Sequence, residues 1–266
     1  MIGYVALPQI ESQMIVYKYV HQDRIDVLQK TCIRFTQAGA VNDPFDTLPS
    51  IVEIKDFVFS EAVKAKRGSR NELSPTETKT LINENHDAFK DFAGVCKTAS
   101  GRYFIFLSLA RQCDNLLMWS HYGDSHKGFV LGFDADSSFF APGNGKARDG
   151  LRKVEYKGTR FRCSPNFRKL TLAKQEEEMT GLLFTKSNDW IYEEELRILA
   201  HPESATYTEI LKNGEKCHLF QFPPDALREI IFGFAISEQK REEIIEIIGT
   251  IGFCVGKGRV CLNERE

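Results

Sequence analysis

Three charged side chains alternate along the segment from Glu193 to Arg197. On a β-strand, alternate side chains share one face, so Glu193, Glu195 and Arg197 would lie together. Two close carboxylates beside an arginine can hold sugar hydroxyls or stabilise a developing cation. The same pattern fits a solvated outer face with a surface ion pair worth about 0–1 kcal/mol. On spacing alone, the solvated face is favoured.

A second polar segment, Leu117–Gly128, has the sequence LMWSHYGDSHKG. Apolar stretches at Tyr103–Leu109 and Phe129–Phe133 predict buried strands on either side of it. A polar, aromatic turn between two core strands lies at a sheet edge, where clefts form. His121 and His126 are candidates for chemistry, although a histidine is more often a structural hydrogen-bonding residue. Their spacing does not present both as metal ligands on one helix, and we expect no metal.

A third segment, Lys146–Lys169, holds nine Lys and Arg residues against the two acids Asp149 and Glu155, with aromatic residues interleaved. Basic side chains neutralise phosphates, and aromatic rings stack on bases. A solvated basic face is about equally expected. Nucleic-acid binding through this segment is therefore one hypothesis of two.

Periodicity and capping signals predict the elements that must position these segments. Strands are predicted at Ile15–Tyr19, Ile33–Phe35, Tyr103–Leu109, Phe129–Phe133, Val154–Tyr156, Tyr192–Ala200 and Glu229–Phe234, and a hairpin at Phe253–Leu262. Helices are predicted at Asp23–Gln29, Ile51–Lys66, Ser74–Cys96, Asn115–Tyr122, Leu170–Phe184 and Ser237–Ile248, and loops at Asn42–Asp46 and Ala135–Gly150. This mixture favours an α+β fold.

Composition limits the class of protein. The 266 residues are 42% hydrophobic and 27% charged, which is ordinary for a globular chain. No Pro/Gly/Ser-rich linker divides them, so we expect one domain over residues 1–266. A net charge of −2 argues against a polycation that must bind nucleic acid. Seven widely spaced cysteines without a C-x-x-C pattern argue against a disulfide framework and a zinc site. With neither a signal peptide nor a long apolar run, a soluble, cytoplasmic protein is expected.

Four segments in order resemble a bacterial family catalogued only as a domain of unknown function. They are Tyr17–Tyr19, Asn42–Asp46, Leu117–Gly128 and Lys186–Arg197. The family pattern usually ends the second segment with Glu, where this chain has Asp46. The resemblance spans about Ile15 to Gly233, and its third and fourth segments are specific in combination.

That family in turn resembles the ADP-ribosyltransferases. This resemblance implies a split mixed β-sheet core with flanking helices that binds NAD in a cleft. Lys18 or Tyr19 would take the position of the first-strand Arg or His, and Ser108 that of the second-strand Ser. Glu195, preceded by Glu193, would take the position of the late-strand Glu. The chain departs from the pattern because Lys18 is neither Arg nor His and Ser108 lacks flanking Ser or Thr.

The resemblance also implies roles. Glu195 would hold the ribose hydroxyl and favour the cationic sugar, Glu193 would orient the acceptor, and Trp119 or Tyr19 would pack on the nicotinamide. Other residues assigned to the site are His121 for catalysis and Tyr17, Lys18, Ser108, Tyr122 and Arg197 for NAD binding. We expect Leu117–Gly128 and Lys186–Arg197 to meet across one cleft.

The expected function is therefore NAD-dependent ADP-ribosyl transfer to a nucleic-acid or protein acceptor bound through Lys146–Lys169. By analogy, such an enzyme would suit a bacterial toxin or a phage-defence effector. Two alternatives stay open. One is a non-catalytic nucleic-acid or partner-binding module, and the other is a nuclease that uses His121 and His126. NAD hydrolysis without transfer would be hard to separate from the main hypothesis.

Overall fold

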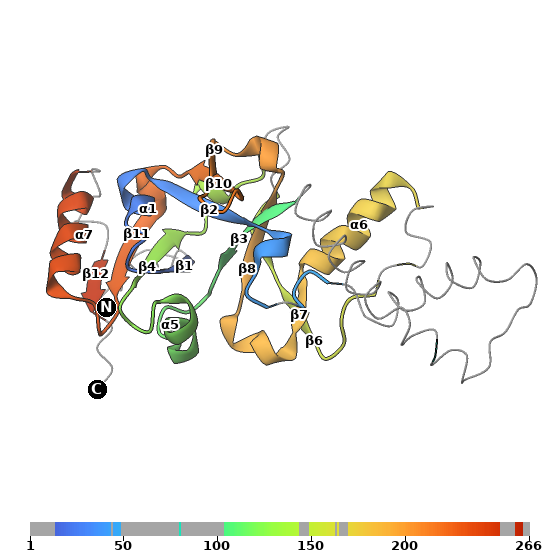
Figure 1. Ribbon diagram of the computed structural model, residues 1–266, viewed down its shortest axis with the longest axis horizontal. Coiled ribbons are helices and arrows are strands. Elements are labelled where there is room, and N and C mark those ends of the chain that lie inside the picture. The colour runs from blue at the N-terminus through green and yellow to red at the C-terminus, as the bar shows by residue number, and fades with distance from the viewer. Residues whose placement is uncertain are drawn as a thin grey trace, which may run out of the picture. The chain divides into compact units, whose positions relative to one another are not determined.

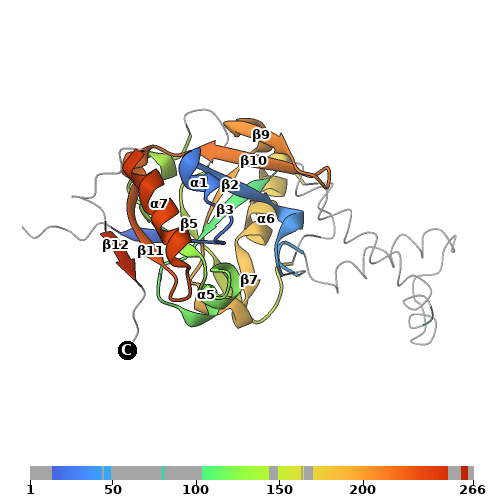
Figure 2. The same ribbon diagram turned by 60° about the vertical axis from the view of Figure 1, so that its left-hand side comes forward.

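The computed structural model describes residues 14–43, 45–48, 80, 104–143, 149–162, 164, 170–250 and 259–262, the last four by backbone alone (Figures 1 and 2). The predicted helix Ile51–Lys66 lies outside the described residues, as does the predicted helix Ser74–Cys96 except for Thr80. The described part is a mixed α+β structure with several antiparallel sheet pairings and few helices. Among the described helices, none is both long enough and apolar enough to cross a membrane.

The chain divides into two compact units, and each is built from separate stretches of sequence. Unit 1 comprises Met1–Cys32, Leu109–Ala141 and Phe222–Glu266, and unit 2 comprises Ile33–Ser108 and Pro142–Gln221. A single domain over residues 1–266 stays a prediction.

Unit 1 contains a four-stranded sheet. Its order is β1 (Ile15–Val20), β4 (Phe129–Asp134), β11 (Leu227–Phe232) and β12 (Arg259–Leu262). The first three strands are antiparallel, whereas β12 lies parallel to β11. Every residue of the inner strand β4 is buried, which is why its sequence is an almost continuous apolar run.

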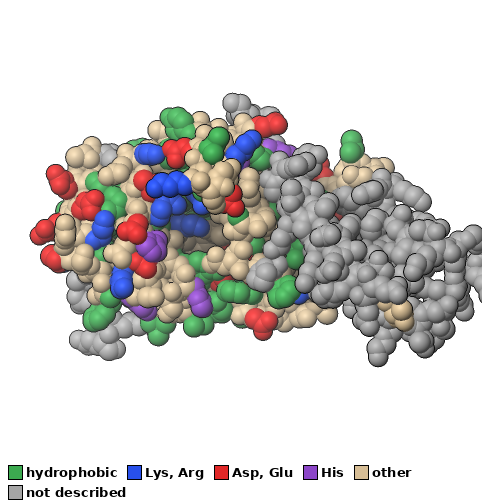
Figure 3. Space-filling model, viewed as in Figure 1, with side chains coloured by type: hydrophobic (Ala, Val, Ile, Leu, Met, Phe, Trp, Pro, Cys, Tyr) green, Lys and Arg blue, Asp and Glu red, His purple; other side chains and the backbone are tan. Residues whose placement is uncertain are grey.

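The described helices of unit 1 are α1 (Asp26–Gln29), α5 (Leu116–Tyr122) and α7 (Glu238–Thr250). Side chains cap α5 and α7, whereas α1 has no side-chain cap. The Asn115 carboxamide oxygen accepts from the first amides of α5, and the Ser237 hydroxyl accepts from Lys240 N at the start of α7. Ile244 and Ile248 face inward from α7, while acidic side chains gather on its outer surface (Figure 3).

Unit 2 contains a six-stranded sheet and a two-stranded one. The larger sheet runs in the order β5 (Arg152–Lys153), β8 (Leu196–Ala200), β3 (Ile105–Leu109), β2 (Cys32–Gln37), β10 (Lys216–Gln221) and β9 (Tyr207–Ile210). The smaller sheet pairs β6 (Glu155–Lys157) with β7 (Thr185–Ser187) in parallel. A buried apolar cluster joins strand residues Phe106 and Leu199 to Leu183 at the end of α6 (Leu172–Leu183).

The structure confirms the predicted strands at β1, β2, β3, β4 and β11 and the helices α5, α6 and α7, within a few residues. It corrects four other predictions. Helix α1 begins only at Asp26, because a turn precedes it. Val154 lies between two short strands rather than within one. The 3-10 helix η2 (Ser138–Phe140) interrupts the predicted loop. The described part of the predicted hairpin, β12, pairs in parallel with β11.

The segment Lys186–Arg197 also differs from its prediction. The strand predicted at Tyr192–Ala200 begins only at Leu196, because Asn188–Glu193 forms the 3-10 helix η4. The Ser187 hydroxyl caps η4, and Glu194 ends it in the left-handed region with φ 42°. Glu193 and Glu195 are therefore not strand neighbours on a flat face. Strands β7, β9 and β10 were not predicted, since they are short or lack a clear alternation.

Candidate functional site

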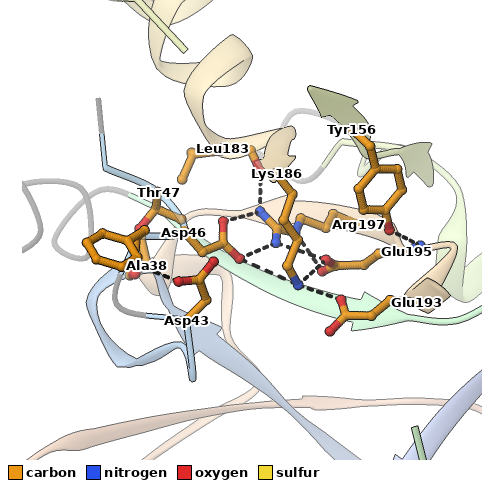
Figure 4. Close-up of polar contacts among 11 residues, drawn as sticks. Ala38, Asp43, Asp46, Thr47, Tyr156, Leu183, Lys186, Glu193, Glu195 and Arg197 are labelled. Atoms are coloured by element: carbon orange, nitrogen blue, oxygen red, sulfur yellow. Dashed lines mark hydrogen bonds and ion pairs between the residues drawn. The ribbon is translucent and has the colours of Figure 1, made fainter. Parts of the chain in front are cut away.

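Five charged side chains of unit 2 meet in its interior (Figure 4). The two cations are Lys186 and Arg197, and the three carboxylates are Asp46, Glu193 and Glu195. None of the five is more than 7% exposed. The prediction that Glu193, Glu195 and Arg197 lie together is confirmed, whereas the solvated outer face is wrong.

Arg197 lies between two carboxylates. Its guanidinium donates to both oxygens of Asp46, at 2.5 and 3.2 Å, and to both oxygens of Glu195, at 2.6 and 2.9 Å. It also donates to the carbonyl oxygen of Leu183 at 2.5 Å, and it lies over the Phe106 ring. Two bidentate pairs use the planar fork of donors that only arginine offers.

Lys186 bridges the remaining carboxylates. Its ammonium nitrogen lies 2.5 Å from Glu193 Oε2 and 3.1 Å from Glu195 Oε2, with Asp46 Oδ2 at 3.9 Å. The half-buried Trp190 ring also lies close to this ammonium, with 5.0 Å between the ring centroid and Lys186 Nζ. Two cations and three carboxylates leave a formal excess of one negative charge in the network.

Local backbone geometry positions the side chains of this network. Asp46 lies in a turn in which Asp43 accepts from the backbone amides of Phe45 and Asp46. Thr47 has φ 63°, and its hydroxyl donates to Ala38 O. The turn thus directs Asp46 inward to Arg197, a residue 151 positions later in the chain. Asp46 belongs to the second segment of the resemblance, but no pattern in the sequence identified it as a partner of Arg197.

Two further polar groups hold Glu195. The backbone amide of Glu195 donates to the Tyr156 hydroxyl at 2.8 Å. The Ser108 hydroxyl forms a hydrogen bond with the Glu195 side chain, which helps to lower its pKa. Ser108 and Glu195 are the residues that the resemblance assigned to the second and third family positions, and the structure brings them into contact.

The network determines the ionisation of its members. Burial by itself would raise the pKa of Glu195, but Arg197 and Lys186 outweigh burial and hold that pKa well below its usual range. Burial would lower the pKa of Lys186, but Glu195, Glu193 and Asp46 raise it. Burial raises the pKa of Tyr156 to about 12. Glu195 is therefore a carboxylate at neutral pH, and Lys186 is an ammonium.

These shifts predict how stability depends on pH. A depressed carboxylate pKa stabilises the fold above the unfolded-chain value of about 4.3, and this contribution is lost as pH falls below it. The raised pKa values of Lys186 and Tyr156 stabilise the fold below about 10, and their contributions are lost above that pH. Urea midpoints measured from pH 3 to 11 should thus fall at both ends. Glu195→Gln should flatten the acid limb alone, and an unchanged acid limb would contradict the assignment.

The aromatic candidates of unit 1 are buried. Trp119 is fully buried, its indole nitrogen donates to Cys113 O at 2.8 Å, and its ring packs edge-on against Tyr19. Tyr19 is also buried and donates its hydroxyl to Gln112 O. Neither ring presents an open face in this structure, so both are core residues of unit 1.

The other candidates of unit 1 are more accessible. His121 is exposed on α5, and Tyr122 is half-buried beside it. Tyr17 and Lys18 are half-buried on β1, and burial, reinforced by a hydrogen bond with Glu229, raises the pKa of Tyr17. Among the described residues, no group of three or more His, Cys, Asp and Glu side chains could hold a metal ion.

The segment Leu117–Gly128 ends in a turn that was not predicted from the sequence. Asp124, Ser125 and His126 all have φ between 50° and 66°, in the left-handed region that non-glycine residues rarely adopt. Two backbone contacts hold this turn, since Gly233 N donates to Gly128 O and Ala235 N donates to His126 O. A Cβ on Gly233 would lie 2.2 Å from His126 O, so glycine is required there. Close backbone packing therefore explains the conformation of this turn, and the explanation requires no catalytic role for its residues.

Leu117–Gly128 lies in unit 1 and Lys186–Arg197 in unit 2, so their meeting across one cleft stays a prediction. The basic segment Lys146–Lys169 is described only in part. Within that part, Arg152 pairs with Asp149 and Lys157 with Glu155, so some of its positive charge is neutralised locally.

Comparison with known proteins adds one finding. Residues 118–198 match the model of a family described as "Protein of unknown function (DUF2971)". The matched region runs from α5 into β8 and contains Lys186, Glu193, Glu195 and Arg197. It agrees with the resemblance to a domain-of-unknown-function family. Neither the curated proteins nor the solved structures contain a match to this chain.

Proposed function

We propose that this protein cleaves the nicotinamide–ribose bond of NAD and transfers ADP-ribose, in the manner of an ADP-ribosyltransferase, with Glu195 as the central carboxylate. The observation that carries the proposal is the hydrogen bond between Ser108 and Glu195. The two residues lie far apart in the sequence, and the resemblance had assigned both to one NAD site. Glu193 lies beside them, joined through Lys186.

The chemistry suits an ionised carboxylate. The bond between the nicotinamide nitrogen and the ribose carbon breaks, and neutral nicotinamide leaves with the bonding electron pair. Positive charge then develops on the ribose, and a fixed carboxylate in a dry site stabilises it strongly. The acceptor forms the new bond to the ribose carbon and releases its proton to Glu193. Arg197 keeps Glu195 charged for this role.

Access to Glu195 requires Lys186 to move. In the structure Lys186 occupies the carboxylate oxygens of Glu193 and Glu195 that a ribose hydroxyl would approach. NAD carries a positive charge on its nicotinamide ring. This ring can therefore take the place of the Lys186 ammonium between the carboxylates of Glu193 and Glu195. Nucleic acid or protein would be the acceptor, bound through Lys146–Lys169, and a bacterial toxin or phage-defence effector is the proposed setting.

Ser108→Ala tests the observation directly. Losing a hydrogen bond to a charged group costs about 1.5–3 kcal/mol, so nicotinamide release should slow by roughly 10-fold or more. Ser108→Thr keeps the hydroxyl and should recover most of the rate, which a purely structural role would not require. The assay is nicotinamide release at saturating NAD, with folding checked by thermal melt. Full activity in a folded Ser108→Ala variant would contradict the assigned contact.

A further inference from the structure

An exposed aromatic ring and an arginine lie together in unit 2. Phe45 lies two positions after Asp43 in the turn that directs Asp46 inward, and the residue is 53% exposed. The guanidinium carbon of Arg160 lies 4.1 Å from the centroid of the Phe45 ring. The turn therefore holds one side chain in the network and its neighbour, Phe45, at the surface.

The arginine has unused hydrogen-bonding capacity. Arg160 Nη1 is buried and has no hydrogen-bond partner in the described part of the chain. Nη1 itself is closed to solvent, so a ligand acceptor would meet the accessible part of the Arg160 side chain, which is half-buried as a whole. Arg152 and Lys157 already have carboxylate partners in their own segment, which makes Arg160 different.

We propose that Phe45 and Arg160 form a platform on which a base of single-stranded nucleic acid stacks, with Arg160 contacting the adjacent phosphate. An exposed phenylalanine with a guanidinium over it offers stacking, cation–π and phosphate contacts at one point. Exposed basic side chains continue nearby in sequence, at Lys153 and Arg162. A single strand is favoured over a duplex because its bases are unpaired and can unstack from one another to stack on aromatic side chains.

Other exposed aromatic and charged surfaces fit this ligand less well. Phe234 is 80% exposed in unit 1, but it precedes α7, whose outer surface is acidic (Figure 3). An acidic surface repels phosphates. Tyr207 lies on the edge strand β9, followed by Glu209 on the same strand face. Among the described residues, Phe45 is thus an exposed ring with a cation over it, and Phe234 is a natural control.

The proposal is tested by fluorescence anisotropy with the full chain and a labelled single-stranded oligonucleotide of about 12 nucleotides, as DNA and as RNA. Phe45→Ala should weaken binding by roughly 5- to 100-fold, the effect of losing one stacked base. Phe45→Trp should retain binding. Arg160→Ala should weaken binding and make log K less steep in log salt by about 0.7 for one lost phosphate contact.

Phe234→Ala is the matched control and should bind as the wild type does. Phe45 is exposed, so its replacement should leave the thermal melt close to that of the wild type. The measurement contains no NAD, so its outcome is separate from that of the proposed glycosyl transfer. Absent binding at low salt, or equal effects of Phe45→Ala and Phe234→Ala, would overturn the proposal. Displacement of the oligonucleotide by AMP at equal concentration would overturn it in favour of a free nucleotide.

Discussion

The Glu195→Gln variant is expected to release nicotinamide from NAD at least about 100-fold more slowly than the wild type, the effect of removing one electrostatic stabiliser. Glutamine keeps the size of the side chain and one acceptor oxygen but carries no charge. The developing positive charge on the ribose would then lose its nearest counter-charge. The expected loss is in the rate of bond cleavage rather than in NAD binding, because the charge develops only as the bond breaks.

The charges around Glu195 indicate how Glu195→Gln should affect the stability of the network. Neutralising Glu195 leaves two cations and two carboxylates, so the buried network stays formally balanced. The new amide group faces the donors of Arg197 and Lys186, so a stability loss of about 1–3 kcal/mol is expected. Activity should therefore be measured well below the melting temperature.

Glu194→Gln is the matched control for Glu195→Gln. Glu194 is adjacent in sequence, but it is the left-handed residue that ends η4, and it is half-buried whereas Glu195 is buried. Its variant should release nicotinamide within about twofold of the wild type. Glu193→Gln should impair transfer to an acceptor more than simple NAD cleavage. Wild-type protein that neither binds nor cleaves NAD, with acceptor extract present, would refute the proposed function.

Arg197→Met should lower the free energy of unfolding by about 3–5 kcal/mol, the usual cost of removing one partner from a buried ion pair. Methionine fills much of the same volume but donates no hydrogen bond. Asp46 and Glu195 would then lie in the interior with only Lys186 to balance three carboxylates. A domain with a typical total stability of about 5–15 kcal/mol would lose a large part of it.

Arg152→Met is the control for charge removal in the same sheet. Arg152 is 51% exposed on β5, and its carboxylate partner Asp149 is 3.9 Å away. Its replacement should cost no more than about 1 kcal/mol. Urea denaturation gives both values. Combining Arg197→Met with Asp46→Asn should cost less than the sum of the single changes, because each removes a charge that the other leaves unpaired. Equal costs for Arg197→Met and Arg152→Met would show that the network is solvated.

Local signals in the sequence were sufficient for many elements. Continuous apolar runs predicted the buried strands at Phe129 and Ile105, because a strand covered on both faces needs apolar side chains at every position. Helix α7 was predicted from its cap, because Ser237 satisfies an amide only a few residues away. The grouping of Glu193, Glu195 and Arg197 was also predicted, although its geometry is not that of a strand.

Tertiary structure alone decided the character of the candidate site. The spacing of Glu193, Glu195 and Arg197 by itself favoured a solvated face, and that prediction was wrong because spacing carries no information about what covers a surface. Burial followed from Asp46, which reaches Arg197 across 151 positions of sequence. The left-handed turn at Asp124–His126 likewise depends on contacts between residues that are far apart in the sequence. This turn contains no glycine that would indicate positive φ from the sequence. Backbone contacts from Gly233 and Ala235 stabilise the turn instead. Short-range patterns determine helices and strands because their hydrogen bonds are local or repetitive, whereas the pairing of distant charges and backbones depends on how the chain packs.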